Sequence, residues 1–373
     1  MATRELQAPR TPEEAAALVR QCGADGLTVR VRGGGTKLGW GTPTTDPDVE
    51  ISTSSLKELL EHNEGDLTTI VEPGVRFDDA QKRYAKKGQM LALDPPTLGD
   101  ATIGGVLASG DSGPLRHRYG APRDLVLGMT VALSDGTVAK SGGRVIKNVA
   151  GYDIAKLFCG SFGTLGLILQ VALRLHPRPP QTVTVVARTG DPDALARAAS
   201  DLTHASLEKE CVDVRWDEGG GAALVQLGGA TAHAQAEAAA KLVGDLEVEL
   251  HEKDRDLWEQ QRAGQRSTEQ AVVRVSGLQT ELGRVVRATQ NAGGALVGRA
   301  ALGLSWVRVA PDGVEELRRE LAPFPCVVLD APAELRSSID VWDSGDGLEI
   351  ARRIKQRFDP AGTFAPGTFA GGI

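Results

Sequence analysis

The sequence predicts an α+β fold in two parts, and three observations predict it. Short apolar strands alternate with amphipathic helices along most of the chain, as in sheets covered by helices. A proline cluster at 177–180 separates a glycine-rich first part from a second part of regular strand and helix repeats. The 373 residues suffice for two domains of roughly 100–200 residues each. We therefore expect boundaries at 1–180, 181–345 and 346–373, the last a helix and tail that pack back on the first part.

The first part opens with a helix. Thr11 can cap it, Pro12 suits its first turn, Glu14 completes a capping box, and it should stop near Gly23. The next expected elements are a strand at 28–32, a short helix at 54–62, a strand pair around 68–75 and a helix at 77–87 ended by Gly88. A long loop at 93–124, a hairpin at 126–143 that turns at 134–136, a short helix at 153–159 and a strand at 167–175 should follow.

The second part should form a smaller α+β sheet domain with helices on one face. Strands are expected at 182–188, 212–216, 222–229, 246–250, 272–277, 302–309 and 326–332, and helices at 193–202, 232–243, 281–291 and 313–321. A last helix at 348–358 precedes a tail rich in proline and glycine.

Charge and composition narrow the function classes. The net charge of −7 argues against a nucleic-acid or anionic-membrane partner, because both need a positive field. No stretch approaches the roughly 20 apolar residues of a transmembrane helix, and the amino terminus lacks the apolar block of a secretory signal. The four cysteines are far apart with no C-x-x-C pair, so no metal or cluster site is expected. These features predict a cytoplasmic location without a transmembrane segment.

A glycine triplet follows the first expected strand, in the run Arg32-Gly33-Gly34-Gly35-Thr36-Lys37. Successive backbone N–H groups without side chains form a nest that binds phosphate oxygens. The run matches neither the G-x-G-x-x-G fingerprint nor the P-loop. A simple tight turn is the alternative interpretation.

The stretch 93–124 is also dense in glycine. Pro95 and Pro96 stiffen its entry, and closely spaced glycines would let the backbone wrap a large flat or extended ligand. A structural Ω-loop is the alternative. The later run GSFGTLG at 160–166 is weaker evidence for ligand binding, because close backbone packing alone could explain its glycines.

Taken in order, these three runs resemble the FAD-binding domain of the vanillyl-alcohol oxidase/p-cresol methylhydroxylase superfamily, over about residues 10–180. The local runs at 112–116, 145–157 and 359–367 further resemble glycolate oxidase FAD-binding subunits (GlcE-like). The last run departs from that family's Asn-Pro-Gly, because it has Ala365 before Pro366 and Gly367. The resemblance over 181–345 is much weaker.

The resemblance implies a non-covalent FAD. Some relatives attach flavin through a histidine directly after the glycine triplet, and Thr36 stands there instead. His117 is the alternative attachment point. The glycine loop would hold the pyrophosphate, and the 96–110 stretch would line the ribityl chain and the flavin. Residues 119–124 would flank that stretch, and residues 163–168 would approach the adenine. The implied FAD-binding residues are Arg32, Gly33, Gly34, Gly35, Thr36, Lys37, Pro96, Thr97, Gly104, Gly105, Ser109, Gly110, Tyr119, Asp124, Gly163, Gly166 and Ile168.

Catalytic residues are harder to place. Arg116 and Arg123, with their neighbours His117 and Arg118, could stabilise an anionic reduced flavin or bind the carboxylate of a 2-hydroxy acid. A solvated basic loop, or a docking surface for an acidic partner, is the alternative. No histidine has metal-ligand spacing, and we find no H-x-G-D-G-N-H-like run that would supply a base.

The resemblance therefore implies the FAD-binding subunit of a glycolate oxidase or dehydrogenase complex. Such a subunit supports oxidation of glycolate to glyoxylate and passes electrons to a partner. The implied partners are a sister FAD subunit and an iron–sulfur subunit, through which the cytoplasmic chain would lie peripherally at the inner membrane. The alternatives are a self-sufficient FAD-dependent 2-hydroxy-acid dehydrogenase and a non-catalytic, flavin-stabilised structural subunit.

Overall fold

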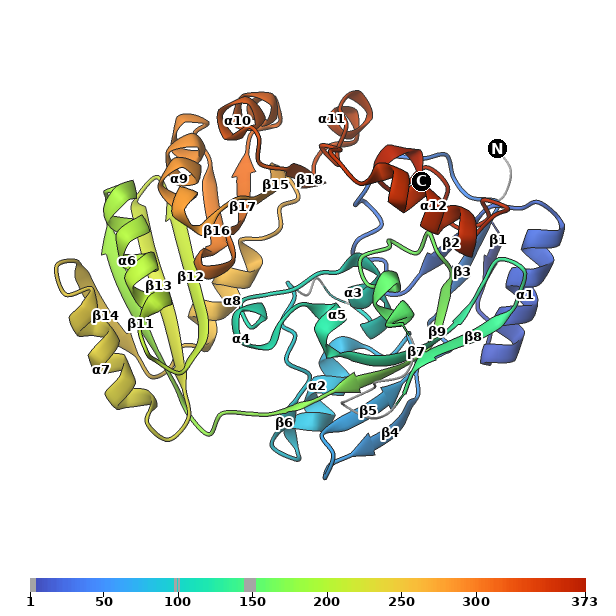
Figure 1. The fold of residues 1–373 in the computed structure, drawn as a ribbon, viewed down its shortest axis with the longest axis horizontal. Coiled ribbons are helices and arrows are strands. Elements are labelled where there is room, and N and C mark those ends of the chain that lie inside the picture. Colours follow the sequence, from blue (N-terminus) through green and yellow to red (C-terminus); the bar gives the residue numbers. More distant parts are fainter. Residues whose placement is uncertain (1–4, 97–98, 100, 144–151) are drawn as a thin grey trace.

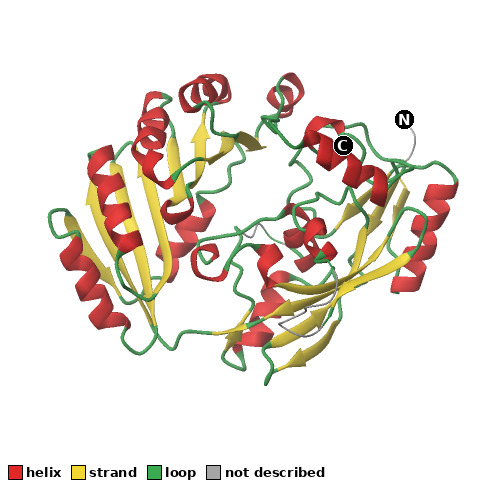
Figure 2. Ribbon diagram, in the orientation of Figure 1, coloured by secondary structure: helices red, strands yellow, loops and turns green. Residues whose placement is uncertain are grey.

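The computed structural model describes residues 5–96, 99, 101–143 and 152–373. Figure 1 shows two parts side by side, and Figure 2 shows that both combine sheet and helix, as the sequence predicts. No helix in these described ranges is both long and apolar enough to cross a membrane.

The amino-terminal part holds two main sheets. One has three parallel strands in the order β1-β3-β2, and the other has five antiparallel strands in the order β4-β5-β9-β7-β8. The pair β10-β6 is separate. The strands are β1 (Glu5–Gln7), β2 (Val29–Arg32), β3 (Val49–Ser52), β4 (Leu59–Asn63), β5 (Thr68–Val71), β6 (Gln89–Met90), β7 (Val126–Ala132), β8 (Val138–Gly142), β9 (Leu167–Arg174) and β10 (His176–Pro177).

Helices cover these sheets and build two apolar cores. Val19 of α1 packs with Ile51 and Leu169, while Tyr84 of α2 and Leu107 of α3 pack in a second cluster with strands β5, β7 and β9. The helices of this part are α1 (Pro12–Ala24), α2 (Phe77–Ala85), α3 (Ile103–Ser109), α4 (Arg116–Tyr119), α5 (Pro122–Leu125) and the 3₁₀ helix η1 (Ile154–Phe158).

Residues 182–330 supply one eight-stranded antiparallel sheet, in the order β14-β11-β13-β12-β16-β17-β15-β18. Its strands are β11 (Thr182–Thr189), β12 (Lys209–Asp217), β13 (Gly220–Gly228), β14 (Glu247–His251), β15 (Ala271–Ser276), β16 (Ala295–Arg299), β17 (Leu304–Val309) and β18 (Cys326–Asp330). Its helices are α6 (Pro192–His204), α7 (Ala232–Leu242), α8 (Arg255–Ala263), α9 (Leu282–Asn291) and α10 (Val314–Leu321).

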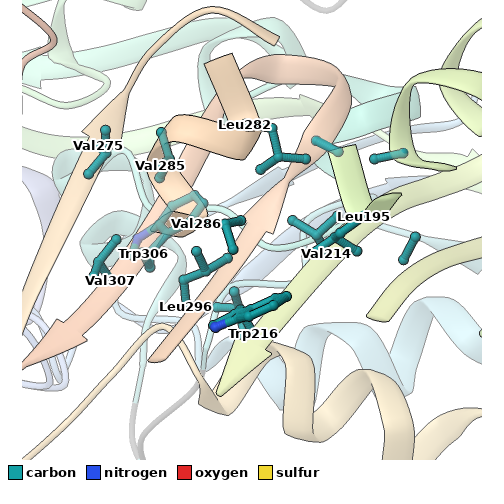
Figure 3. Close-up of a cluster of buried hydrophobic side chains, with 14 of the residues drawn as sticks. Leu195, Val214, Trp216, Val275, Leu282, Val285, Val286, Leu296, Trp306 and Val307 are labelled. Carbon is teal, nitrogen blue, oxygen red and sulfur yellow. The ribbon is translucent and has the colours of Figure 1, made fainter. Parts of the chain in front are cut away.

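Helices α6, α7, α9 and α10 lie along one face of this sheet (Figure 1). In Figure 3, Leu195 of α6 and Val286 of α9 pack over Val214 and Leu296 of the strands. The sequence predicts helices on one face only, and this prediction is wrong, because α8 packs against the other face. Gln261 of α8 donates to Asp213, whose side chain alternates with that of Val214 and so points to the opposite face.

Some local predictions are wrong. The expected helix at 54–62 does not form: residues 54–58 are a turn and loop, and strand β4 begins at Leu59 because the chain there pairs with β5 at the edge of the five-stranded sheet. The expected loop at 93–124 contains α3, α4 and α5, and the helix expected at 153–159 is 3₁₀. Strand β16 and helix α8 are absent from the sequence-based prediction.

The chain returns to its beginning at the carboxyl terminus, through α11 (Ala333–Ser338) and α12 (Leu348–Phe358). The Val29 N–H donates to the Thr363 carbonyl at 2.7 Å, and the Ala365 N–H donates to the Val29 carbonyl at 2.8 Å. The tail thus lies beside β2, which leads directly into the glycine triplet.

Candidate cofactor site

The glycine triplet forms an open loop at the end of β2. The N–H groups of Gly34, Gly35 and Thr36 have no hydrogen-bond partner among the described residues. Residues 33–37 line a cavity of about 110 Å³. Gly35 has φ +76°, and a Cβ on Gly33 would overlap the Thr102 hydroxyl, so both positions need glycine. Three consecutive unpaired donors in residues that line a cavity are the arrangement that binds phosphate oxygens.

A second cavity of about 70 Å³ continues the first, because Gly33, Gly105, Ala108 and Phe162 line both. Gly163, with φ +74°, lines it and has open space where a side chain would stand. Of the predicted FAD-binding residues, those that line one or both cavities are Gly33, Gly34, Gly35, Thr36, Lys37, Gly104, Gly105, Ser109, Gly163, Gly166 and Ile168.

The nearest cations are already paired. Arg32 Nη1 lies 3.2 Å from Glu50, and Lys37 Nζ lies 3.1 Å from the buried Asp111. Burial raises the pKa of Asp111, and Lys37 opposes that shift. Because these side-chain charges are balanced within the protein, binding of an anion at the loop depends mainly on the backbone donors.

A much larger cavity, about 1060 Å³, lies between the amino-terminal part and the end of α8. Pro96 lines it from one side, and Arg262, Arg266 and Arg308 line it from the other. Asp94 lies in its wall with 14% of its side chain exposed, 3.7 Å from Arg262. Burial raises the pKa of Asp94 to about 7, and the charges of Arg262 and Arg299 limit the increase.

The remaining predicted residues lie elsewhere. The Tyr119 hydroxyl donates to Glu210 of β12 at 2.7 Å, and Asp124 accepts from the Ala121 N–H at 2.8 Å. Gly110 ends α3 with φ +65°. Thr97 lies outside the described residues.

The two candidate catalytic arginines are not together. Arg116 is partly buried, and burial together with the nearby charge of Arg299 lowers its pKa. Arg123 is exposed on α5, near Cys159. Of the two, Arg116 faces the eight-stranded sheet.

Sequence reasoning missed the contribution of the second part to this region. Arg266 donates to the Thr36 carbonyl at 3.3 Å, and its guanidinium stacks over Trp40 at 5.0 Å. Arg308 comes from a strand that the sequence predicts, but nothing in the sequence indicates where its side chain points. Phe162 belongs to the GSFGTLG run, and its φ of +56° is a further sign of a special position.

Residues 5–142 match the family model of the FAD binding domain. Over 200 residues the chain is 34% identical to glycolate oxidase subunit GlcD of Bacillus subtilis, covering 54% of this chain and 43% of that protein. Over 182 residues it is 30% identical to glycolate oxidase subunit GlcE of Escherichia coli, covering 48% of this chain and 51% of that protein. The chain therefore spans about half the length of the curated relatives that it matches.

A solved structure, alkyldihydroxyacetonephosphate synthase, superposes with a TM-score of 0.70 at 15% identity, covering 96% of this chain and 76% of that one. The likeness extends to the fold of nearly the whole chain, including the part beyond the matched domain. The unpaired N–H groups at Gly34, Gly35 and Thr36 also fit the diphosphate of FAD. Residues 5–142 therefore match an FAD binding domain, and over about half of its length the chain is similar to subunits of glycolate oxidase.

Proposed function

We propose that the chain is the FAD-binding subunit of a glycolate oxidase-type complex, in which it supports the oxidation of a 2-hydroxy acid to the 2-oxo acid. The observation that carries the proposal is the row of unpaired N–H groups at residues 34–36, in a domain matched to FAD binding. The similarity to glycolate oxidase subunits GlcD and GlcE supports the substrate class.

The backbone of residues 33–37 would hold the diphosphate without a covalent bond, and Gly163, Gly166 and Ile168 would lie along the adenine end. Pro96 lines the large cavity, so the flavin end would lie toward that cavity. The other residues of the set inferred from the resemblance are Arg32, Thr97, Gly104, Gly105, Ser109, Gly110, Tyr119 and Asp124. His117 lies on α4 and is not among the residues that line the glycine-loop cavity.

Oxidation of a 2-hydroxy acid removes the hydroxyl proton together with a hydride from C2, and a carbonyl group forms. Bound FAD supplies the acceptor of the two electrons. This chain's residues bind and orient the acid, and a cation near the flavin stabilises its reduced form. Arg116 is our candidate for that cation because it faces the eight-stranded sheet, whereas Arg123 is exposed and would act at a distance or at a partner surface.

Electrons must then leave the chain, and we propose that a sister FAD subunit and an iron–sulfur subunit receive them. Through these partners the chain, which we propose is cytoplasmic, would lie peripherally at the inner membrane. Glycolate oxidase subunits GlcD and GlcE bear the word subunit in their names, which supports an assembly of more than one chain.

The test is the absorption spectrum of the purified chain, before and after anaerobic addition of glycolate or D-lactate. A colourless chain that stays colourless after soaking with FAD would overturn the proposal. Flavin bleached only when partner chains are present supports the subunit, whereas flavin bleached in the isolated chain supports a self-sufficient dehydrogenase. Flavin that no 2-hydroxy acid bleaches in the assembled complex would instead indicate a structural subunit.

A further inference from the structure

The surface where η1 packs against α12 combines exposed apolar side chains with arginines. We call Ile154, Leu157, Ile350, Arg353 and Arg357 the η1–α12 patch. We propose that this patch docks a partner chain whose contacting segment carries an apolar side chain between carboxylates. The inference rests on the proposed function for the existence of partner subunits, but not for the oxidation of a 2-hydroxy acid.

The two helices form one continuous surface. Phe158 of η1 and Phe358 of α12 meet edge to face, with their ring centroids 5.6 Å apart. Leu157 of η1 and Ile354 of α12 line the same groove, which has a volume of about 120 Å³. An apolar cavity of about 150 Å³ accommodates a benzene molecule, so this groove has room for part of an apolar side chain from another molecule.

Apolar side chains on both helices are open to solvent. Ile154 and Leu157 are 39% and 40% exposed, and residues three apart lie on the same side of a 3₁₀ helix. Ile350 is 63% exposed and lies one turn before Ile354, on the same face of α12. Apolar side chains that gather in this way on an exposed surface are typical of an interaction site.

The charges of α12 indicate the chemistry of the partner. Four of its 11 residues are cationic and one is anionic, in a chain whose net charge is −7. Lys355 and Arg352 are engaged within the chain, but the exposed Arg353 and Arg357 have no hydrogen bond or ion pair with any described residue. Both lie on the face of α12 that carries Ile350. Carboxylates on the partner would complement them.

Two other occupants fit this patch less well. A second copy that docked through the same patch would bring Arg353 and Arg357 against the same two residues, because a two-fold contact uses one surface twice. Like charges that meet at an interface oppose association. Segments that bind anionic membranes carry clusters of roughly four to eight basic residues, and here two arginines are unengaged. A different chain with carboxylates satisfies both the apolar and the cationic groups.

Coproduction with the proposed partners tests the patch. The full chain carries an affinity tag and is coproduced with the sister FAD subunit and the iron–sulfur subunit. Size-exclusion chromatography and mass spectrometry then give the amount of partner recovered per tagged chain. Ile350→Asp should reduce this recovery roughly tenfold or more, because it places a carboxylate at the apolar centre, opposite those of the partner. The double variant Arg353→Glu and Arg357→Glu should reduce it as well.

The matched controls make the same changes elsewhere. Leu278→Asp alters an apolar side chain that is 64% exposed beside the eight-stranded sheet, and Arg319→Glu reverses an exposed charge on α10. Neither control should change the recovery. Each variant should keep the flavin content and urea midpoint of the unaltered chain, because the altered side chains are exposed. Full recovery in both patch variants, or equal losses in the controls, would overturn the proposal.

The isolated chain tests the other occupants. A dimer that Ile350→Asp converts to a monomer would assign the patch to a second copy. Sedimentation with phosphatidylglycerol vesicles but not with phosphatidylcholine vesicles, lost in the double arginine variant, would assign it to a membrane. Loss of the partner in Ile350→Asp but not in the double variant would show that the partner does not supply carboxylates. Each of these results contradicts the proposal.

Anaerobic flavin bleaching separates this inference from the proposed function. If assembly depends on the patch but no 2-hydroxy acid bleaches the flavin of the complex, the function fails and the docking surface stands. If a 2-hydroxy acid bleaches the flavin and the patch variants assemble normally, the function stands and the inference fails. An unaltered chain that assembles with neither subunit overturns both.

Discussion

Arg266 and Asp330 form a two-bond ion pair that also reaches the glycine loop. Arg266 donates to both carboxylate oxygens of Asp330 and, through Nη2, to the carbonyl of Thr36 at 3.3 Å. Asp330 also accepts from the Trp40 indole N–H at 2.8 Å. Residues of the eight-stranded sheet and of the segment after α8 therefore hold the loop that we propose binds the diphosphate.

Asp330→Ala should destabilise the protein and weaken FAD binding together. The substitution leaves Arg266 charged and unpaired in a site where only 10% of its side chain is exposed, which is expected to lower the free energy of unfolding by about 3–5 kcal/mol. Urea denaturation and a flavin titration measure the two effects.

The control for this variant is Glu259→Ala. It breaks the exposed Arg255–Glu259 pair and should change stability by less than about 1 kcal/mol. Equal losses in Asp330→Ala and Glu259→Ala would mean that the buried pair does not support the loop.

Gly34→Val should yield protein without flavin, because a branched side chain in the loop would keep phosphate oxygens away from the backbone donors. Gly39→Val is the matched control: it lies five residues further along the chain, and a Cβ there meets no atom within 4 Å. Absorbance at the flavin band against protein concentration gives the stoichiometry. A fully yellow Gly34→Val protein would show that the diphosphate binds elsewhere.

The glycine loop can be predicted from the sequence because its conformation depends on the residues of the run itself and not on distant parts of the chain. A strand that ends in three glycines exposes backbone N–H donors whatever surrounds it. The structure has a cavity beside residues 33–37, where this pattern predicts a binding site. The same holds for the start of α1, where the Thr11 hydroxyl accepts from the Glu14 N–H as the capping pattern predicts.

Contacts that cross the chain could not be predicted in this way. The Arg266–Thr36 hydrogen bond joins residues 230 positions apart, and no local pattern marks it. The segment 54–62 was wrongly predicted for the opposite reason: its residues favour a helix, but pairing of Leu59 with Val71 makes its second half a strand. Local preference is weak where an edge strand completes a sheet.

Lys355→Met should loosen the carboxyl-terminal tail. The Lys355 ammonium donates to the carbonyls of Thr164 and Phe364 at 2.8 and 2.7 Å and to Asp359 at 2.6 Å. Removing it leaves these acceptors without a charged donor, and we expect a loss of about 3–5 kcal/mol in the free energy of unfolding. Thr164 follows Gly163, so FAD affinity should fall as well.

Arg353→Met on the same helix serves as the comparison for Lys355, because that side chain is exposed. It should leave both the urea midpoint and the flavin content unchanged. If Lys355→Met behaves in the same way, the tail contributes nothing measurable to the site.

Asp94 should make the stability of the protein depend on pH. Burial raises its pKa in the folded state to about 7, above the value of about 3.9 expected in the unfolded chain. The folded state therefore binds the proton more tightly, and between about pH 4 and pH 7 it carries more protons than the unfolded state. Stability must then decrease as the pH rises through this range, by roughly 4 kcal/mol at most, and level off above it.

Asp94→Asn removes this titration but keeps an oxygen that can accept from the Leu115 N–H, as Asp94 does at 3.0 Å. The free energy of unfolding of the unaltered protein, minus that of the variant, should fall as the pH is raised from 4 to 7. Burial raises the pKa of Asp213 to about 6, and this group contributes with the same sign. Because Asp213 is present in both proteins, only the part of its titration that depends on the charge of Asp94 remains in the difference. Urea denaturation at each pH measures the slope, and the exposed Asp312→Asn is the control. A difference that stays level or rises with pH would mean that Asp94 is ionised throughout, with Arg262 stabilising its charge.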